Sequence, residues 1–150
     1  MIKNRLHKNG NMRGFSLLEL LIAIALLAIG LLAAATMQGV AMNANSHANR
    51  ISMATMVGQQ VAEDLCSLKI TDPLLHTAVA NATYNRLFDP ATNASTAGAV
   101  LMPGAGTFSA QYDIAPNTPM TGTTQITVRV FYNGSTTPAI TFSTCKMVVL

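Results

Sequence analysis

The sequence predicts an α+β fold, in which one long N-terminal helix is followed by a small antiparallel sheet. Apolar residues run almost without interruption over residues 15–35 and then recur at steps of three and four as far as residue 68, which is the period of a helix. The last third of the chain instead holds segments in which apolar and polar residues alternate, as in half-buried strands. We expect the outer half of the helix to pack on the sheet.

The positive charge of the chain is concentrated at its N-terminus. The first 14 residues hold no acidic side chain and four basic ones, which are Lys3, Arg5, Lys8 and Arg13. From residue 15 onward, five basic and six acidic side chains nearly cancel. The isoelectric point of about 9.1 therefore describes this short leader rather than a binding surface. We expect no nucleic-acid partner, because the body of the chain offers no basic patch.

Residues 15–35 form an apolar segment long enough to cross a bilayer. As a helix, these 21 residues would span about 30 Å, the thickness of one hydrocarbon core. The basic leader precedes the segment and no basic residue follows it closely, so the positive-inside rule places the N-terminus in the cytoplasm. We expect the chain beyond about residue 38 to lie on the other side of the membrane.

One acidic residue, Glu19, interrupts this apolar segment. An isolated carboxylate there costs about 2–3 kcal/mol, and such residues are usually functional. A cleaved secretory signal peptide is one alternative, with Ala33-Ala34-Ala35 as its cut site, although the helical pattern continues past these residues. An uncleaved signal anchor is a second alternative. Neither alternative gives Glu19 a role.

The residues around the start of the apolar segment point to a family. The order Arg13-Gly14-Phe15-Ser16-Leu17-Leu18-Glu19, before a long apolar helix, resembles the processing site of type IV prepilins and type II secretion pseudopilins. The resemblance implies that a prepilin peptidase cuts between Gly14 and Phe15 on the cytoplasmic side and N-methylates Phe15. The leader, residues 1–14, is then lost and the helix is kept. A glycine fits this position, since the peptidase can approach its backbone closely.

The resemblance also implies a fold, an assembly role and partners. The fold is the type IV pilin fold, and Glu19 is expected to meet the N-terminal amine of a neighbouring subunit. Residues 15–38 would serve as transmembrane and assembly helix, and residues 39–150 as the periplasmic, later extracellular, globular domain. The implied partners are the prepilin peptidase, other major and minor pilins, the inner-membrane assembly platform, and membrane lipid before assembly. The protein would first be a single-pass inner-membrane protein and then part of an extracellular pilus.

Within the family, the sequence is most similar to the PilV type of minor pilin. This similarity is carried by Ile29-Gly30-Leu31-Leu32 and by Gln59-Gln60-Val61-Ala62-Glu63. The predicted function is therefore that of a minor type IV pilin, in adhesion, motility or DNA uptake. A type II secretion minor pseudopilin is one alternative. A signal-anchored periplasmic binding module that never assembles is the other.

The helix is predicted to continue to about residue 68. Beyond a polar patch at residues 43–49, apolar residues share one face, as expected for packing against a sheet. These residues are Ile51, Ala54, Val57, Val61, Leu65 and Leu68. Asp72 and Pro73 are typical of a helix N-cap and first position, and predict a short helix to about Ala80.

Three strands are predicted in the rest of the chain, at residues 108–114, 125–132 and 139–150, whereas residues 81–107 are predicted as loop with room for one short element. The alternation in the last strand changes phase. Ile140 and Phe142 share one face, but Cys145 and Met147 share the other. We expect a bulge near residues 143–144 to explain this change.

The chain contains two cysteines, Cys66 and Cys145, at a spacing that matches no zinc or redox motif. In an exported domain they predict one disulfide between the end of the helix and the last strand, with two free thiols as the alternative. Closing a loop of about 80 residues would contribute about 4 kcal/mol at most.

Residues for catalysis or metal binding are not evident in the sequence. His7, His47 and His76 are scattered, without neighbouring clusters of carboxylates or cysteines. No nucleophile motif or phosphate-binding glycine loop occurs. We therefore expect no enzymatic activity, no metal site and no cofactor.

Overall fold

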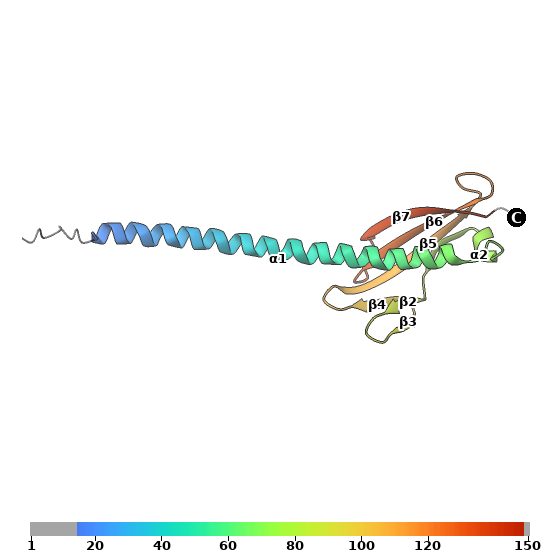
Figure 1. The fold of residues 1–150 in the computed structure, drawn as a ribbon, viewed down its shortest axis with the longest axis horizontal. Helices are drawn as coiled ribbons and strands as arrows, with labels where there is room; N and C mark the ends of the chain where they lie inside the picture. Colours follow the sequence, from blue (N-terminus) through green and yellow to red (C-terminus); the bar gives the residue numbers. More distant parts are fainter. Residues whose placement is uncertain (1–14, 149–150) are drawn as a thin grey trace, which may run out of the picture. The chain divides into compact units, whose positions relative to one another are not determined.

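The structure, a computed structural model, describes residues 15–148, so the leader with Gly14 lies outside the described residues. Helix α1 (Leu17–Ser67) and the short α2 (Pro73–His76) come first in the chain (Figure 1). The strands that follow are β1 (Val79–Thr83), β2 (Leu87–Asp89), β3 (Ala94–Thr96), β4 (Ala99–Met102), β5 (Gly106–Pro116), β6 (Thr123–Tyr132) and β7 (Ile140–Met147). The predicted α+β class is confirmed, and the arrangement is consistent with the type IV pilin fold.

The described chain divides into two compact units, one that ends at Met42 and one that begins at Asn43. The first unit contains only the beginning of α1. All of its described residues, from residue 15 to residue 42, are exposed to solvent. A helix that is apolar around its whole circumference satisfies its own backbone hydrogen bonds but leaves its side chains without a packing partner.

In the second unit, one face of α1 packs on the sheet, as the sequence predicted. The residues of α1 that are buried are Ala54, Val57, Gly58, Val61, Ala62 and Leu65, at helical steps of three and four. Two of them, Gly58 and Ala62, were not in the predicted stripe. A Cβ on Gly58 would lie 2.5 Å from Cε1 of Phe142, so the glycine lets the helix approach β7 closely.

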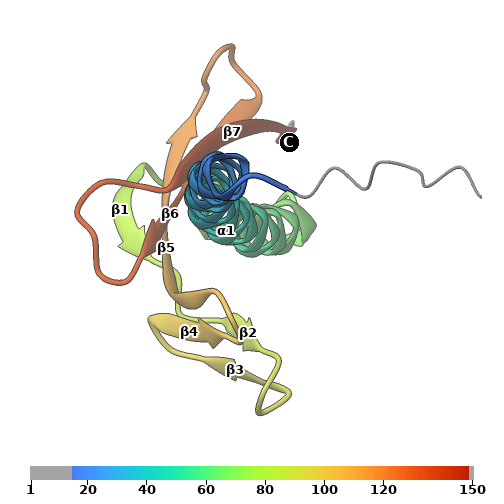
Figure 2. The ribbon, with the colours of Figure 1, turned by 90° about the vertical axis from the view of Figure 1, so that its left-hand side faces the viewer.

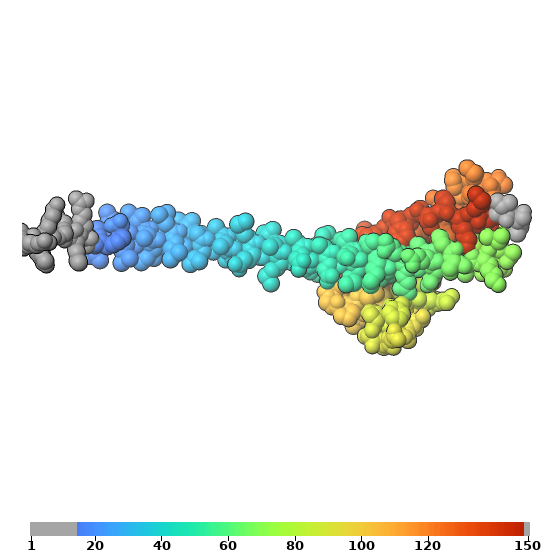
Figure 3. All heavy atoms as spheres, in the orientation of Figure 1, coloured from blue at the N-terminus to red at the C-terminus, as the bar shows by residue number. Residues whose placement is uncertain are grey.

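The main sheet has the order β1-β5-β6-β7, and β4 also pairs with β5. All of its pairs are antiparallel. Figure 2 shows β4, β2 and β3 on the opposite side of the sheet from β7, and in Figure 3 the segment around β3 forms a separate lobe beside the helix. The sheet therefore has one edge at β7 and another at β1 and β4.

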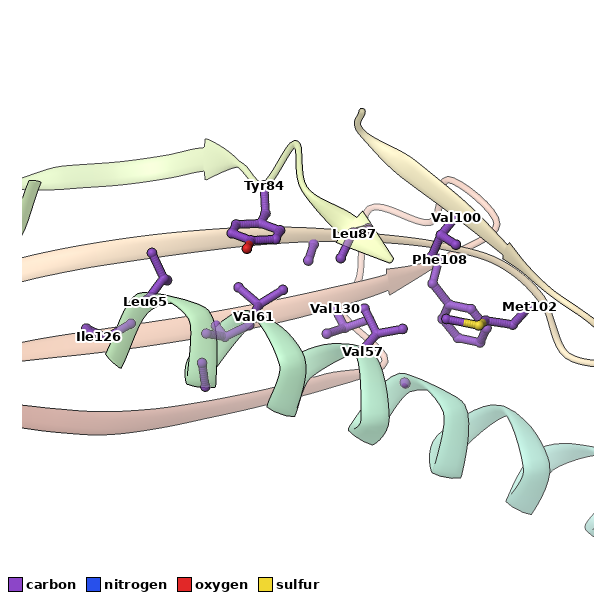
Figure 4. Close-up of a cluster of buried hydrophobic side chains, with 14 of the residues drawn as sticks. Val57, Val61, Leu65, Tyr84, Leu87, Val100, Met102, Phe108, Ile126 and Val130 are labelled. Atoms are coloured by element: carbon purple, nitrogen blue, oxygen red, sulfur yellow. The ribbon is translucent and has the colours of Figure 1, made fainter. Parts of the chain in front are cut away.

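The core of the second unit lies between α1 and the inner face of the sheet. Every second residue of β6 is buried there, namely Thr124, Ile126, Val128 and Val130. Phe108 of β5 is completely buried, and its ring lies 5.4 Å from the ring of Tyr132 between centroids. Figure 4 shows Phe108, Ile126 and Val130 of the sheet with Val57, Val61 and Leu65 of α1 in this core.

Two predictions for the middle of the chain were wrong. The short helix begins as predicted, since Asp72 Oδ1 accepts a hydrogen bond from Leu74 N–H at 2.9 Å. It ends at His76, however, because Thr77 is extended and Val79 already pairs with Ile114 of β5. The stretch at residues 81–107, predicted as loop with room for one short element, contains the three strands β2, β3 and β4. Each of them is only three or four residues long, which is too short for a periodic signal.

The predicted bulge in the last strand is also absent. The register of β7 with β6 continues without a shift from Val130 opposite Ile140 to Thr123 opposite Met147. Odd-numbered residues of β7 are therefore exposed on the outer face of the sheet, whereas even-numbered residues are partly buried. The apolar phase change in the sequence arises because Cys145 and Met147 are exposed, and Met147 keeps 71% of its surface accessible.

Candidate functional site

The predicted assembly residue Glu19 lies in the first turn of α1, and Phe15, on the carboxyl side of the predicted cut, lies two residues before the helix begins. Ser16 caps the helix, since its Oγ accepts a hydrogen bond from Leu18 N–H at 3.3 Å and its carbonyl accepts one from Leu20 N–H at 3.2 Å. Glu19 lies in the first turn, where the partial positive charge of the helix terminus favours a carboxylate. The spacing Ser16-x-x-Glu19 is that of a capping box, a signal that our reading of the sequence missed.

The surface around Glu19 is apolar. The carboxylate shares a shallow groove with Ser16, Leu18, Ile22, Ala23 and Leu26. These leucines and the isoleucine are more than half exposed, and Phe15 exposes 81% of its surface. Glu19 is therefore an acidic group on an apolar helix surface, which is suited to a bilayer or to other apolar helices rather than to water.

By length and composition, α1 can cross a membrane, and it is the single such helix among residues 15–148. None of the residues in its most apolar stretch is buried inside the protein. A core helix of a soluble protein would be mostly buried, so the exposure favours a membrane segment over a core helix. This agrees with the predicted anchor.

The predicted disulfide between Cys66 and Cys145 is not formed, and both residues are free cysteines. Cys66 is partly buried in the last turn of α1, against the helix-facing side of the sheet. Cys145 is exposed on β7, whose continuous register directs it to the outer face. The sheet itself thus separates the two thiols, and the pairing prediction was wrong because it assumed that Cys145 faces the helix.

The neighbouring residue, Lys146, makes the connection that the disulfide was expected to make. Its Nζ donates hydrogen bonds to the carbonyl oxygens of Cys66, at 2.6 Å, and of Leu68. The last carbonyls of a helix have no partner within the helix, and they carry partial negative charge that favours a cation. Lys146 therefore ties the end of α1 to the last strand.

We expect Lys146→Met to lower the free energy of unfolding by about 1–3 kcal/mol, because two carbonyls lose a charged donor while the aliphatic stem is kept. The matched variant at the adjacent residue, Cys145→Ser, should change the free energy of unfolding by less than about 0.5 kcal/mol, because Cys145 is exposed and forms no disulfide with Cys66. Urea unfolding of both variants, with and without reductant, measures the difference. A large loss of stability when the wild-type protein is reduced would show that a disulfide is present, which would contradict the structure.

A polar cluster on the outer face of the sheet joins β1, β5 and β6. Arg129 Nη2 donates to Asp113 Oδ1 at 2.6 Å and to Asn81 Oδ1 at 2.7 Å, and Asn81 N–H donates to Asp113 Oδ1 at 2.6 Å. The hydrogen bond from Arg129 is the main cause of a lowered pKa of Asp113. The cluster holds Asn81 in the left-handed conformation, with φ of 53°.

The lowered pKa of Asp113 predicts an acid-dependent loss of stability. A carboxyl with a lower pKa in the folded chain stabilises it above the unfolded pKa of about 4, and this contribution disappears as the pH falls through the folded pKa. Asp113→Asn should therefore flatten the decrease of the melting temperature below about pH 4. Thermal melts at a series of pH values test this, and identical pH profiles of variant and wild type would contradict it.

A second polar contact joins α1 to the segment after β1. Tyr84 donates its hydroxyl to Asp64 Oδ2 at 2.5 Å, and burial together with this hydrogen bond raises the pKa of Tyr84. Asp64 and Tyr84 also line a small cavity of ≈ 230 Å³ with leucines of α1 and α2. Among residues 15–148, no group of three or more histidines, cysteines and acidic residues is placed to hold a metal ion.

Comparison with known proteins assigns the N-terminal part of the chain. Residues 9–35 match the family model described as the prokaryotic N-terminal methylation motif. No curated protein and no solved structure matches the chain. The matched residues include Gly14, Phe15 and Glu19, the residues on which the resemblance was based. The chain therefore carries the N-terminal methylation motif of type IV prepilins and pseudopilins, which supports its assignment as the precursor of a type IV pilin or pseudopilin.

Proposed function

We propose that this chain is a minor type IV pilin, a structural subunit that is stored in the inner membrane and inserted into a pilus. The observation that carries the proposal is the position of the methylation motif. The motif covers residues 9–35 and so includes the beginning of α1. Side chains are exposed along residues 15–48, whereas further along the helix, over residues 54–65, one face is buried on a sheet. A helix with these two parts serves as an anchor and as an assembly surface.

Processing would occur between Gly14 and Phe15 and would create a new amino terminus one helical turn before Glu19. A prepilin peptidase is the expected enzyme, and N-methylation of Phe15 would follow. The charged amine and the Glu19 carboxylate would then lie on the same apolar end of the helix. In a bundle of such helices, the amine of one subunit meets Glu19 of its neighbour, so that neither charge is buried without a partner.

The pairing would favour one axial register between subunits. In the monomer, Glu19 is an unpaired carboxylate within an apolar segment and carries a cost of about 2–3 kcal/mol. Pairing in the fibre removes this cost only when the amine and the carboxylate are level. The partners in this step are other major and minor pilins through their N-terminal helices, together with the inner-membrane assembly platform.

The fibre fraction of cells tests this function. We expect the processed chain to appear in pili sheared from the cell surface, and we expect Gly14→Leu to retain the leader and to remain in the inner membrane. A matched change at the preceding position, Arg13→Lys, should leave both properties unchanged. If the wild-type chain stays in the membrane while other pilins are sheared off, the assignment to a pilus is wrong. A secretion defect without any pilus defect would instead favour a type II secretion pseudopilin, which shares the motif.

A further inference from the structure

Strand β7 ends the main sheet, and in residues 15–148 no other strand pairs with its outer side. The hydrogen bond from Val148 N–H to the carbonyl of Gly122 continues the β6–β7 ladder by one pair. In an antiparallel ladder, hydrogen-bonded pairs alternate with non-bonded pairs. Even-numbered residues of β7 therefore bond to β6. The backbone N–H and C=O groups of Thr141, Ser143 and Cys145 point to the free edge.

The same alternation holds across the rest of the sheet. Asn133 N–H donates to Thr107 O at the end of the β5–β6 ladder, so odd-numbered residues of β6 bond to β5 and even-numbered ones are left for β7. Tyr84 N–H donates to the carbonyl of Ala110, an even-numbered residue of β5 on the side away from β6. Three independent hydrogen bonds thus fix the direction in which the backbone groups of β7 point.

The opposite edge of the sheet carries features that block strand pairing, whereas β7 does not. Strand β1 has five residues and a register shift between Val79 and Ala82, and its Asn81 has a positive φ held by the cluster around Asp113. Strand β4 has four residues. Strand β7 has eight residues, a regular register and neither proline nor glycine. Its one charged side chain, Lys146, is bound to the end of α1 and does not guard the edge.

We propose that the free edge of β7 accepts an extended segment of a different pilin subunit, rather than of a second copy of this chain. The segment runs antiparallel to β7 and extends the sheet by one strand. The backbone groups at the edge supply the affinity, as in other cases of strand addition. Side chains of the incoming strand opposite Thr141, Ser143 and Cys145 would lie on the outer face beside small polar groups. Those opposite Phe142 and Thr144 would face the helix layer and would be apolar.

The direction of β7 argues against a second copy of the same edge as the occupant. Ile140 and Phe142 lie beside Gly58, and Lys146 lies beside Cys66 and Leu68, so β7 runs in the same direction as this part of α1. An antiparallel pair of two β7 strands would place the two helix segments antiparallel. Subunits that share one fibre have the same polarity, which excludes this pair. The identity of the occupant rests on the proposed function, whereas the acceptor edge does not.

The test uses full-length protein in detergent and a synthetic peptide with the β6 sequence, TTQITVRVFY, as the probe. This peptide has the required alternation, because β6 already packs against α1 through every second residue. In the protein alone, amides of Thr141, Ser143 and Cys145 should exchange at least about tenfold faster than those of Phe142 and Thr144. Addition of the peptide should slow the fast set by at least about tenfold.

Backbone methylation of the peptide gives a matched pair of probes. Polar residues of the bound peptide must lie on the outer face, so their N–H groups point to β7, while those of its apolar residues point away. N-methylation at the position of Thr127 should therefore abolish binding, and N-methylation at Val128 should leave it intact. In the protein, Ser143→Pro should weaken binding about tenfold or more, since it removes an outward N–H that β6 does not use. Ser143→Ala controls for the loss of the hydroxyl contact with Thr127.

Each outcome decides a part of the proposal. Slow exchange of the three amides in dilute protein, or no slowing on addition of peptide, would overturn the acceptor edge. Protection that rises with protein concentration alone would make a second copy of this chain the occupant and overturn the assignment to a different pilin subunit. In sheared fibres the three amides should be protected, and rapid exchange there would also overturn that assignment. Absence of the chain from fibres would count against the proposed function. The peptide experiment would still show whether the edge of β7 accepts a strand. If Ser143→Pro fails to fold, the two methylated peptides remain decisive.

Discussion

Replacement of Glu19 with alanine is expected to deplete the chain in sheared fibres by at least about tenfold, while removal of the leader proceeds normally. Loss of one member of a buried ion pair costs roughly 3–5 kcal/mol, because the remaining charge is left without a partner in an apolar surrounding. Here the remaining charge would be the N-terminal amine of a neighbouring subunit. Immunoblots of the membrane and fibre fractions measure the ratio, and the size of the protein reports cleavage.

Glu63→Ala is the matched control for this variant. Glu63 is an exposed acidic residue on the same helix, but it lies beyond the apolar segment. Its loss should leave the fibre fraction unchanged. The capping contribution of Glu19 to α1 is worth less than about 1 kcal/mol, which is too small to explain a tenfold depletion through helix stability alone. Equal fibre fractions of the Glu19→Ala variant and wild type would refute the pairing role.

Replacement of Phe108 with alanine should destabilise the second unit by about 3–5 kcal/mol, a large part of the stability of a domain of this size. The side chain is completely buried, and its ring contacts that of Tyr132 at 5.4 Å between centroids. Removal of the ring leaves a cavity between α1 and the sheet that the surrounding strands cannot fill. Urea unfolding, monitored by the near-ultraviolet circular dichroism of the tyrosines, measures this loss without interference from the helix.

Phe88→Ala provides the comparison, since Phe88 belongs to β2 and leaves 42% of its surface exposed. We expect it to cost less than about 1 kcal/mol. If the two phenylalanine variants lower stability equally, the core is not placed as described.

The long helix and the late strands were predictable because each produces a periodic signal over many residues. The face of α1 that carries Val57, Val61 and Leu65 repeats every turn, and the inner face of β6 repeats every second residue. Strands β2, β3 and β4 have no such signal, since three or four residues give too few repeats. They form because β4 pairs with β5, and β2 with β3, across short connections, and these inter-strand hydrogen bonds leave no periodic apolar pattern in the sequence.

The cysteine prediction failed for a related reason. It placed Cys66 at the end of the helix and Cys145 in the last strand correctly, but it treated the change of apolar phase in that strand as a bulge. The structure instead keeps a regular ladder and exposes Met147, so Cys145 points away from the helix. The cue for the actual contact was Lys146, a cation one residue further along on the opposite face.

At the candidate site, the residue types and their order were sufficient to predict the family motif, but the local role of Ser16 was overlooked. Ser16 caps α1 and fixes where the helix starts, which places Glu19 in its first turn. Processing at Gly14 and Phe15 stays a prediction, because Gly14 lies outside the described residues.

The most direct test of the central claim is the mass of the mature N-terminal peptide, obtained from protein isolated from its native membrane or fibres. We expect a chain that begins at Phe15, with one additional methyl group on its amino nitrogen. A chain that still begins at Met1, or one cut after the small residues near Ala35, would contradict the assignment as a prepilin.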